Sequence, residues 1–207
     1  MSTRSKLSLI TLTLLILAAV AVYLVEMREP PPPEFDNHMG VSVISPPVPL
    51  PSVTLQDQNK APFPISKLEG HWSLMFFGYT HCPDVCPTTL NTLNLTSKKL
   101  PASINYVFVT LDPKRDTAEK LKGYLEYFNP SFIGLTGKKR EIDRLSKRLG
   151  VIYDYEGDVK SGNYSVNHYA GILVVDPRGR LRAHILPPHT VAKLVKATTG
   201  LMNYYGN

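Results

Sequence analysis

The chain contains two cysteines, Cys82 and Cys86, which stand four residues apart in the run Gly-Tyr-Thr-His-Cys-Pro-Asp-Val-Cys-Pro (residues 78–87). Pro87 has no N–H group and disfavours a helical conformation at Cys86, so we expect Cys86 at the start of a helix and Cys82 about one turn before it. Thiols at a helix N-terminus feel the positive end of the helix dipole, which favours the thiolate. A thiolate is both a nucleophile and a metal ligand, so the pair predicts redox chemistry or metal binding.

Three kinds of site use such a pair. A structural disulfide would close a ring of about five residues, for which the entropic gain is only about 2 kcal/mol, so it is the least favoured. Structural zinc takes four ligands and would need two histidines in addition. Thiolates select Cu(I), and two thiolates with one imidazole would hold both Cu(I) and Cu(II). Zinc and copper both stay open at this point.

One of the six histidines suits a third ligand position. His168 precedes a predicted buried strand, at the end of a loop that could fold over the sheet edge carrying the cysteines. His81 adjoins Cys82, but adjacent side chains leaving a strand point apart, so we expect a structural or supporting role for it. The remaining histidines are expected to be surface or structural residues: His38, His71, His184 and His189.

Apolar runs predict the strands that position these residues. Residues 72–77 and 104–110 are short and almost continuously apolar, which is typical of buried strands. Residues 41–55 are broken by prolines and predict a loop that leads into an edge strand at 53–55. Residues 170–175 and 181–185 flank an Asp-Pro-Arg-Gly turn and predict a hairpin.

Helical spacing and capping residues predict four helices in the same region. The first is expected from residue 87 to 100, and the second begins after an N-cap at Asp116, with Glu119 three residues later. The third is expected from 138 to 149, where Gly150 ends it, and the fourth from about 191 to 201. Residues 154–163 are polar and predict an irregular excursion. The element order predicts a thioredoxin-like α/β fold, a three-layer α/β/α domain with a mixed sheet, and places the cysteines at the carboxyl end of that sheet.

The N-terminal part predicts a membrane anchor. Residues 7–25 are apolar and uncharged and follow Arg4 and Lys6; as a helix they would span about 28 Å, close to the hydrocarbon thickness of a bilayer. A cleaved signal peptide is the alternative, because residues 19–21 (Ala-Val-Ala) are typical of a cleavage site, although its apolar core would normally be shorter, about 7–15 residues. The predicted organisation is a cytoplasmic N-terminus (1–6), a transmembrane anchor (7–25), a proline-rich linker (26–50) and a globular domain outside the cytoplasm (51–207).

The charge of the chain argues against a nucleic-acid partner. From residue 34 onward, 20 Lys and Arg stand against 15 Asp and Glu, a net charge of +5 with both signs interleaved. Nucleic-acid binding domains usually carry a stronger, clustered basic patch. The basic residues between 138 and 148 are therefore expected to form the solvated face of a helix.

Several motifs together resemble the Sco/SenC family of membrane-anchored, thioredoxin-like copper-binding proteins. The resemblance runs from about residue 53 to the last helix and is carried by Phe-Gly-Tyr-Thr-His-Cys-Pro-Asp-Val-Cys-Pro (77–87), Leu-Asp-Pro-Lys-Arg-Asp-Thr (111–117), Gly-Leu-Thr-Gly (134–137), Tyr-Ser-Val-Asn-His (164–168) and Asp-Pro-Arg-Gly (176–179). It implies copper, as Cu(I) or Cu(II), bound by Cys82, Cys86 and His168. It also implies Asp112 as a residue that supports the site from behind the ligands, whereas Asp116 better fits a turn or a cap.

The resemblance further implies a role in assembling the copper A centre of cytochrome c oxidase. The expected partners are the copper-bearing subunit of that oxidase and another periplasmic copper chaperone. The expected location is a bacterial inner membrane, with a single span and the C-terminal domain in the periplasm. One departure is visible: the family usually has an aspartate before the histidine and a small hydroxyl residue after it, where this chain has Asn167 and Tyr169.

The sequence therefore predicts a copper metallochaperone rather than an enzyme. The alternative is a periplasmic thiol-disulfide oxidoreductase that uses Cys82 and Cys86 as a redox pair to reduce partner cysteines, and the three residues between the cysteines weigh mildly against it. A peroxidase is a weaker alternative, since Thr80 stands two rather than three residues before Cys82. A purely structural or interaction module is the fourth.

Overall fold

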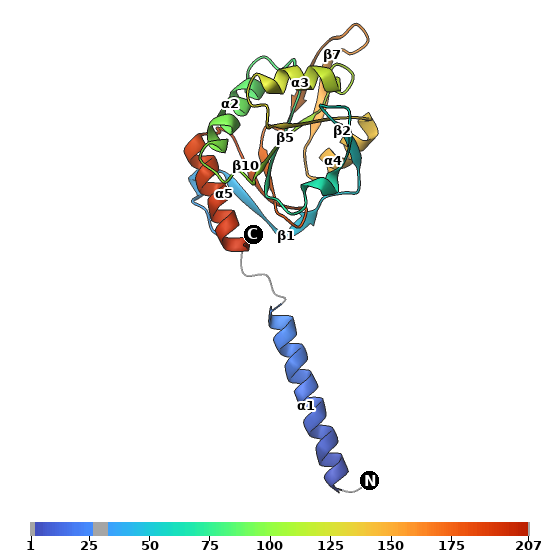
Figure 1. Cartoon of the computed structure of the whole chain (residues 1–207), viewed down its shortest axis with the longest axis vertical. Helices are drawn as coiled ribbons and strands as arrows, with labels where there is room; N and C mark the ends of the chain where they lie inside the picture. Colours follow the sequence, from blue (N-terminus) through green and yellow to red (C-terminus); the bar gives the residue numbers. More distant parts are fainter. Residues whose placement is uncertain (1–2, 27–32, 207) are drawn as a thin grey trace. The chain divides into compact units, whose positions relative to one another are not determined.

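The structure is a computed structural model that describes residues 3–26 and 33–206. The chain divides into two compact units, residues 1–32 and 33–207. The first unit contains one helix, α1 (Thr3–Glu26) (Figure 1). Within the described part of the chain, no helix combines the length and the apolar character needed to cross a membrane. Residues 1–2 of the predicted cytoplasmic segment and residues 27–32 of the predicted linker lie outside the described residues.

The second unit is built on an eight-stranded mixed sheet with the order β1-β10-β9-β4-β5-β6-β2-β3. Strands β4, β5 and β6 are parallel, and the remaining pairs are antiparallel. The strands are β1 (Val41–Pro49), β2 (Thr54–Asp57), β3 (Pro62–Pro64), β4 (Ser73–Gly78), β5 (Asn105–Thr110), β6 (Ile133–Thr136), β9 (Ile172–Val175) and β10 (Arg180–Ile185). A separate hairpin consists of β7 (Tyr153–Asp158) and β8 (Asn163–His168).

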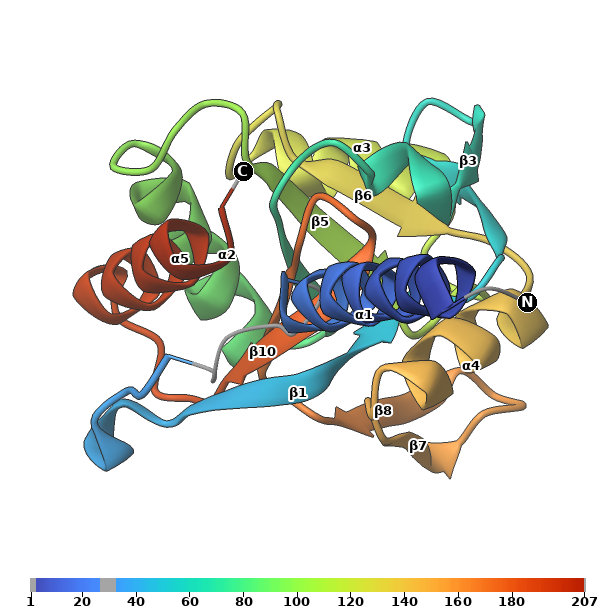
Figure 2. The ribbon, with the colours of Figure 1, turned by 90° about the horizontal axis from the view of Figure 1, so that it is seen from below.

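Helices cover both faces of this sheet, as predicted. They are α2 (Val85–Ser97), α3 (Ala118–Glu126), α4 (Lys139–Arg148) and α5 (Val191–Tyr205), with short 3₁₀ turns at Asn37–Met39 and Ile65–Leu68. The crossovers β4-α2-β5 and β5-α3-β6 run in the same direction along the sheet, and right-handed connections then place α2 and α3 on one face. Figure 2 shows α5 on that side as well, with α4 on the other.

The core explains why β4 is so apolar. All six residues of β4 are buried, because the strand lies in the middle of the sheet with helices on both sides. Phe76 and Phe77 of β4 and Phe108 of β5 are among the largest fully buried side chains. The two buried strands predicted at residues 72–77 and 104–110 are therefore confirmed.

Six strands differ from the predictions: β1, β2, β3, β6, β7 and β8. Residues 41–49 form β1 instead of a loop; its prolines are tolerated because β1 is an edge strand whose pairing with β10 is irregular between Val43 and Val48. The strand expected at the edge, β2, is covered by β3 on its outer side. Strand β6 separates the two helices that were expected in succession. The polar segment at 154–163, which was predicted to be irregular, is part of the β7–β8 hairpin.

Two helices also begin at different residues than expected. Helix α2 starts at Val85, so Pro87 lies in its first turn; proline is tolerated there because the first N–H groups of a helix have no partner within the helix. Helix α3 is capped by Thr117, whose side chain accepts a hydrogen bond from the Lys120 backbone N–H, and not by Asp116. The side chain of Asp116 is used elsewhere, as described below.

Candidate metal centre

The predicted ligands lie at the carboxyl edge of the sheet, where open α/β sheets place their sites. Strand β4 ends at Gly78, and the chain then turns so that the Cys82 N–H donates to the Tyr79 carbonyl over 3.2 Å. Cys86 follows in the first turn of α2 and is fully buried, whereas Cys82 is partly exposed. Both cysteines are free thiols in this structure.

Gly78 is required for the position of Cys86. A Cβ atom at Gly78 would lie 2.7 Å from Cys86 Sγ and 2.9 Å from the Phe108 ring. Both distances are shorter than real Cβ contacts, so any larger residue would displace the sulfur or the ring. The absence of a side chain at the end of β4 thus allows the second thiol to lie directly against the strand.

His168 joins the two thiols, although it is separated from them by more than 80 residues. It is the last residue of β8, and its Nε2 lies 3.7 Å from Cys86 Sγ. The two sulfurs and one imidazole nitrogen all lie within 4.8 Å of one another. Metal bonds to sulfur and nitrogen are about 2.0–2.3 Å long, so one ion between the three atoms would need only a small closing movement.

The tautomer of His168 is set by its neighbour. Its Nδ1 lies 2.9 Å from the Tyr169 carbonyl oxygen, which can only accept a hydrogen bond, so Nδ1 carries the proton. The lone pair then resides on Nε2, which is the atom facing the sulfurs. Hydrogen bonding of the non-ligating nitrogen to a carbonyl is the usual arrangement for a metal-binding histidine. The rings of Phe76 and Tyr79 contact the imidazole edge-on and hold its plane.

The two thiols differ in their acidity. A hydrogen bond from Cys86 lowers the pKa of Cys82 to about 4. The same hydrogen bond, together with burial, raises the pKa of Cys86 above its ordinary value. At neutral pH the metal-free site therefore holds a thiolate at Cys82 and a thiol at Cys86.

Asp112 contacts the strand that ends at His168. It is almost completely buried, its backbone N–H donates to Thr110 Oγ1 over 2.9 Å, and its carboxylate forms an ion pair with Arg115. Tyr164, on the strand that ends at His168, donates its hydroxyl to Asp112 Oδ1 over 2.8 Å. Asp112 contacts no ligand in these interactions, and the prediction that it supports the site from behind stays a prediction.

The other histidines lie outside the cluster formed by the described residues. His81 Nε2 lies 3.1 Å from Lys120 Nζ, and burial together with that cation lowers the pKa of His81. His184 Nδ1 bonds the Tyr169 hydroxyl over 2.9 Å, and His189 Nε2 lies 3.1 Å from the Ile185 carbonyl. Because only one histidine joins the two thiols, the four ligands of structural zinc are not assembled among the described residues.

The residues flanking His168 have partners of their own. Asn167 donates to Glu156 Oε2 over 2.9 Å across the β7–β8 hairpin. An aspartate at this position would bring a second carboxylate against Glu156 and lose the hydrogen bond. Tyr169 contributes its carbonyl to His168 and its hydroxyl to His184. Neither role could be predicted from spacing, because the β7–β8 hairpin was not predicted.

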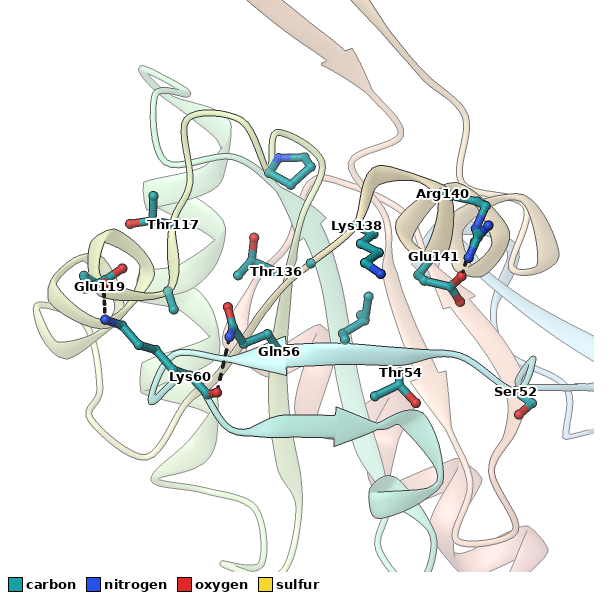
Figure 3. A pocket seen from close by; sticks show the side chains of 14 residues that line it. Ser52, Thr54, Gln56, Lys60, Thr117, Glu119, Thr136, Lys138, Arg140 and Glu141 are labelled. Carbon is teal, nitrogen blue, oxygen red and sulfur yellow. Dashed lines mark hydrogen bonds and ion pairs between the residues drawn. The ribbon is translucent and has the colours of Figure 1, made fainter.

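A groove of about 880 Å³ lies away from the ligands, between β2 and the first turns of α3 and α4 (Figure 3). None of the three predicted ligands lines it. Its charged side chains largely neutralise one another, since Lys60 pairs with Glu119 and Arg140 with Glu141. The groove is therefore separate from the sulfur and imidazole cluster.

A family model described as SCO1/SenC matches residues 51–203 of the chain. A relative from Stutzerimonas stutzeri is 43% identical over 143 residues, which cover 67% of this chain and 70% of that protein. The structure of Bradyrhizobium japonicum ScoI with copper bound is 33% identical with a TM-score of 0.65, covering 75% of this chain and 99% of the other.

The crystal structure of yeast Sco1 with copper bound is similar as well. It is 30% identical with a TM-score of 0.72, and the match covers 77% of this chain and 91% of the yeast chain. These likenesses support the predicted thioredoxin-like α/β fold with a mixed sheet. The matched region contains all three predicted ligands.

Proposed function

This chain belongs to the SCO1/SenC family, and from that membership we propose that it is a copper metallochaperone whose ligands are Cys82, Cys86 and His168. The observation that carries the proposal is the convergence of two sulfurs and one imidazole nitrogen within 4.8 Å. Solved relatives that are 30% and 33% identical have copper bound.

The donor set explains how one site could hold both oxidation states. Two thiolates suffice for Cu(I), which accepts low coordination numbers and soft ligands, whereas the imidazole adds the nitrogen ligand that Cu(II) favours. Binding requires that Cys86 lose its proton, and the positive ion supplies the opposite charge that makes this favourable. The thiolate at Cys82 is available before the metal arrives, so it is the first ligand in our proposal.

We propose assembly of the copper A centre of cytochrome c oxidase as the destination of the metal. The family resemblance carries this part, with the copper-bearing oxidase subunit as recipient and another periplasmic chaperone as donor. Residues 7–25 would anchor the chain in a bacterial inner membrane, with the copper-binding unit in the periplasm. Their uncharged sequence supports this location.

The substitution His168→Ala tests the three-ligand site. We expect the affinity for Cu(II) to fall by at least about 100-fold, more than the 10–100-fold typical for loss of an outer partner. The absorption band of charge transfer from thiolate to Cu(II) should shift or vanish, while Cu(I) stays bound by the two sulfurs. Competitive titration with chelators of known affinity and visible absorption measure both quantities.

His71→Ala is the matched control, because His71 is exposed and lies outside the cluster. It should leave the affinities for both copper ions and the absorption spectrum unchanged. A His168→Ala protein with the wild-type Cu(II) affinity and spectrum would refute the three-ligand model.

One observation favours a second function, the reduction of protein disulfides. The pKa of Cys82 is lowered to about 4 and its side chain is partly exposed, as an attacking thiolate requires. In this reaction Cys82 sulfur attacks one sulfur of the partner disulfide and releases the other as a thiolate. Cys86 then displaces the partner, which leaves both partner cysteines reduced and Cys82–Cys86 oxidised. Rapid reduction of a generic protein disulfide by the metal-free chain would favour this function over copper delivery.

A further inference from the structure

A short segment connects the two halves of the candidate site. Residues 112–116, which we call the bracket, follow β5 and precede α3. The bracket closes on itself, since the backbone N–H groups of Asp116 and Arg115 donate to the Asp112 carbonyl over 2.9 and 3.1 Å. Asp112 and Asp116 therefore stand at the two ends of one tight turn, at the same sheet edge as the ligands.

One end of the bracket holds the cysteine segment. The Asp116 side chain is fully buried and accepts three hydrogen bonds. Its Oδ2 accepts from the Thr80 backbone N–H over 2.9 Å and from Thr110 Oγ1 over 2.6 Å, and its Oδ1 accepts from Thr80 Oγ1 over 2.5 Å. Thr80 lies two residues before Cys82, so Asp116 fixes the chain where it leaves β4 and turns toward the first thiol.

The other end holds the strand that carries the histidine. Tyr164 donates its hydroxyl to Asp112, and Arg115 Nη1 donates to the Tyr164 carbonyl over 2.9 Å. The Arg115 guanidinium also lies 3.6 Å from the centre of the Tyr164 ring. Because Tyr164 stands four residues before His168 on β8, these contacts fix the strand that ends at the imidazole.

We propose that the bracket sets the separation between the thiols and the imidazole, and that Asp116 is the positioning residue for the cysteine side. The inference rests on the proposed copper function. It adds a residue that contacts none of the ligands but fixes the backbone leading to Cys82. Because Cu(I) needs only the two sulfurs whereas Cu(II) uses the imidazole as well, loss of this anchoring should weaken Cu(II) binding more than Cu(I) binding.

The substitution Asp116→Asn, in the full chain, tests the proposal. Three donors face the carboxylate, and an amide offers one acceptor oxygen and turns an N–H₂ group toward the remaining donors. We expect the Cu(II) affinity to fall about 10–100-fold, the range seen when outer partners of metal ligands are removed. The charge-transfer band and the electron paramagnetic resonance of bound Cu(II) should change, with a smaller loss of Cu(I) affinity.

Thr80 provides a milder variant if Asp116→Asn does not fold. Thr80→Val removes the hydroxyl bond to Asp116 Oδ1 and a longer contact of 3.4 Å with His81 Nδ1, and leaves the bond from the Thr80 backbone N–H to Asp116 in place. It should shift the Cu(II) spectrum and affinity in the same direction. Thr80→Ser keeps the hydroxyl and should restore both to the wild-type values. A Thr80→Val protein that matches the wild type in both measurements would contradict the positioning role.

Asp176→Asn is the matched control for general destabilisation. Asp176 is also a buried carboxylate with several donors, among them Arg182 Nε at 2.7 Å and the Arg178 backbone N–H at 3.0 Å, but it lies in the β9–β10 turn. It should lower the melting temperature and leave the Cu(II) spectrum unchanged. Equal spectral changes in both variants, or none in Asp116→Asn, would overturn the inference. A wild-type chain that binds no copper would instead overturn the proposed function.

Discussion

At the scale of single residues, the two thiols of the site have different roles. Cys82 is partly exposed and its pKa is lowered, whereas Cys86 is buried and its pKa is raised. Judged by their positions alone, the two sulfurs would be equivalent ligands. They differ in protonation and in access to solvent. This asymmetry gives a prediction that needs no metal.

In the metal-free protein we expect iodoacetamide to modify Cys82 first, at a rate nearly constant between pH 8 and pH 5.5. The reason is that its pKa of about 4 keeps it a thiolate throughout this range. An ordinary cysteine, with a pKa of about 8.5, would slow about tenfold for each pH unit below that value. Mass spectrometry of alkylated peptides across pH measures the rates.

The lowered pKa of Cys82 also determines how the stability of the metal-free fold changes with pH. The pKa of Cys82 is lower in the folded chain than in the unfolded chain, so its thiolate stabilises the fold above the unfolded pKa of about 8.5. That contribution diminishes as the pH falls toward the folded pKa of about 4.

The alkylation experiment can contradict both statements. A Cys82 alkylation rate that drops tenfold per unit below pH 8 would show that the thiol has an ordinary pKa.

At the scale of elements, the end of β4 is the part of the fold most tightly matched to the site. Gly78 lets the first turn of α2 approach the strand until Cys86 Sγ lies only 2.7 Å from the position that a Cβ atom of residue 78 would take. The close contact between strand and helix therefore fixes the position of Cys86, one of the three proposed ligands.

The substitution Gly78→Ala should lower the free energy of unfolding by about 1–3 kcal/mol, as overpacking of a core does. For a chain of this size that corresponds to a fall of about 2–4 °C in melting temperature for each kcal/mol. It should also weaken copper binding, because Cys86 Sγ has to move. Thermal unfolding and copper titration measure the two effects.

Gly123→Ala serves as the comparison, since Gly123 is exposed within α3 and a Cβ there would meet nothing within 4 Å. Alanine should stabilise that helix by about 0.5–1 kcal/mol. If Gly78→Ala were as stable as the wild type and bound copper equally well, the close approach of Cys86 would have no structural importance.

The elements also show what the sequence could predict. The buried strands could be predicted because central strands are continuously apolar. The position of the cysteine pair could be predicted because the proline and the spacing indicate the start of a helix. The β7–β8 hairpin was missed because its exposed residues are polar. Yet Tyr164, Val166 and His168 alternate with polar residues, and this period of two was the signal for a strand.

The role of Asp116 was missed for a different reason. A carboxylate before a predicted helix favours a cap, and only the folded chain shows that Thr117 takes that position. Thr80, which donates two of the three hydrogen bonds to the Asp116 carboxylate, lies 36 residues away, and such a long-range contact is not encoded in local spacing. The three residues that lie together in the cluster could be selected from the sequence, whereas most of the contacts that hold them could not.

At the scale of the whole molecule, the chain consists of two compact units, and all three proposed ligands belong to residues 33–207. The proposed anchor, residues 7–25, belongs to the other unit. Location and metal binding should therefore be separable properties of the chain.

Deletion of residues 1–32 should move the protein from the membrane fraction to the soluble fraction and leave its affinities for Cu(I) and Cu(II) unchanged. The reason is that the proposed anchor lies in the first unit and the ligands lie in the second. Cell fractionation with carbonate extraction, followed by copper titration of both forms, checks the two statements. Recovery of the full chain in the soluble fraction would refute the anchor.

In the copper delivery that we propose, the unequal exposure of the two sulfurs would give metal transfer a direction. An incoming thiol from a recipient can approach only from the open side, where Cys82 lies, because Cys86 is covered by β4 and by the first turn of α2. Ligand exchange would then proceed in a fixed sequence, with the outer sulfur replaced first and the inner sulfur last. The ion would remain attached to one partner or the other throughout its passage, never released into the surrounding water.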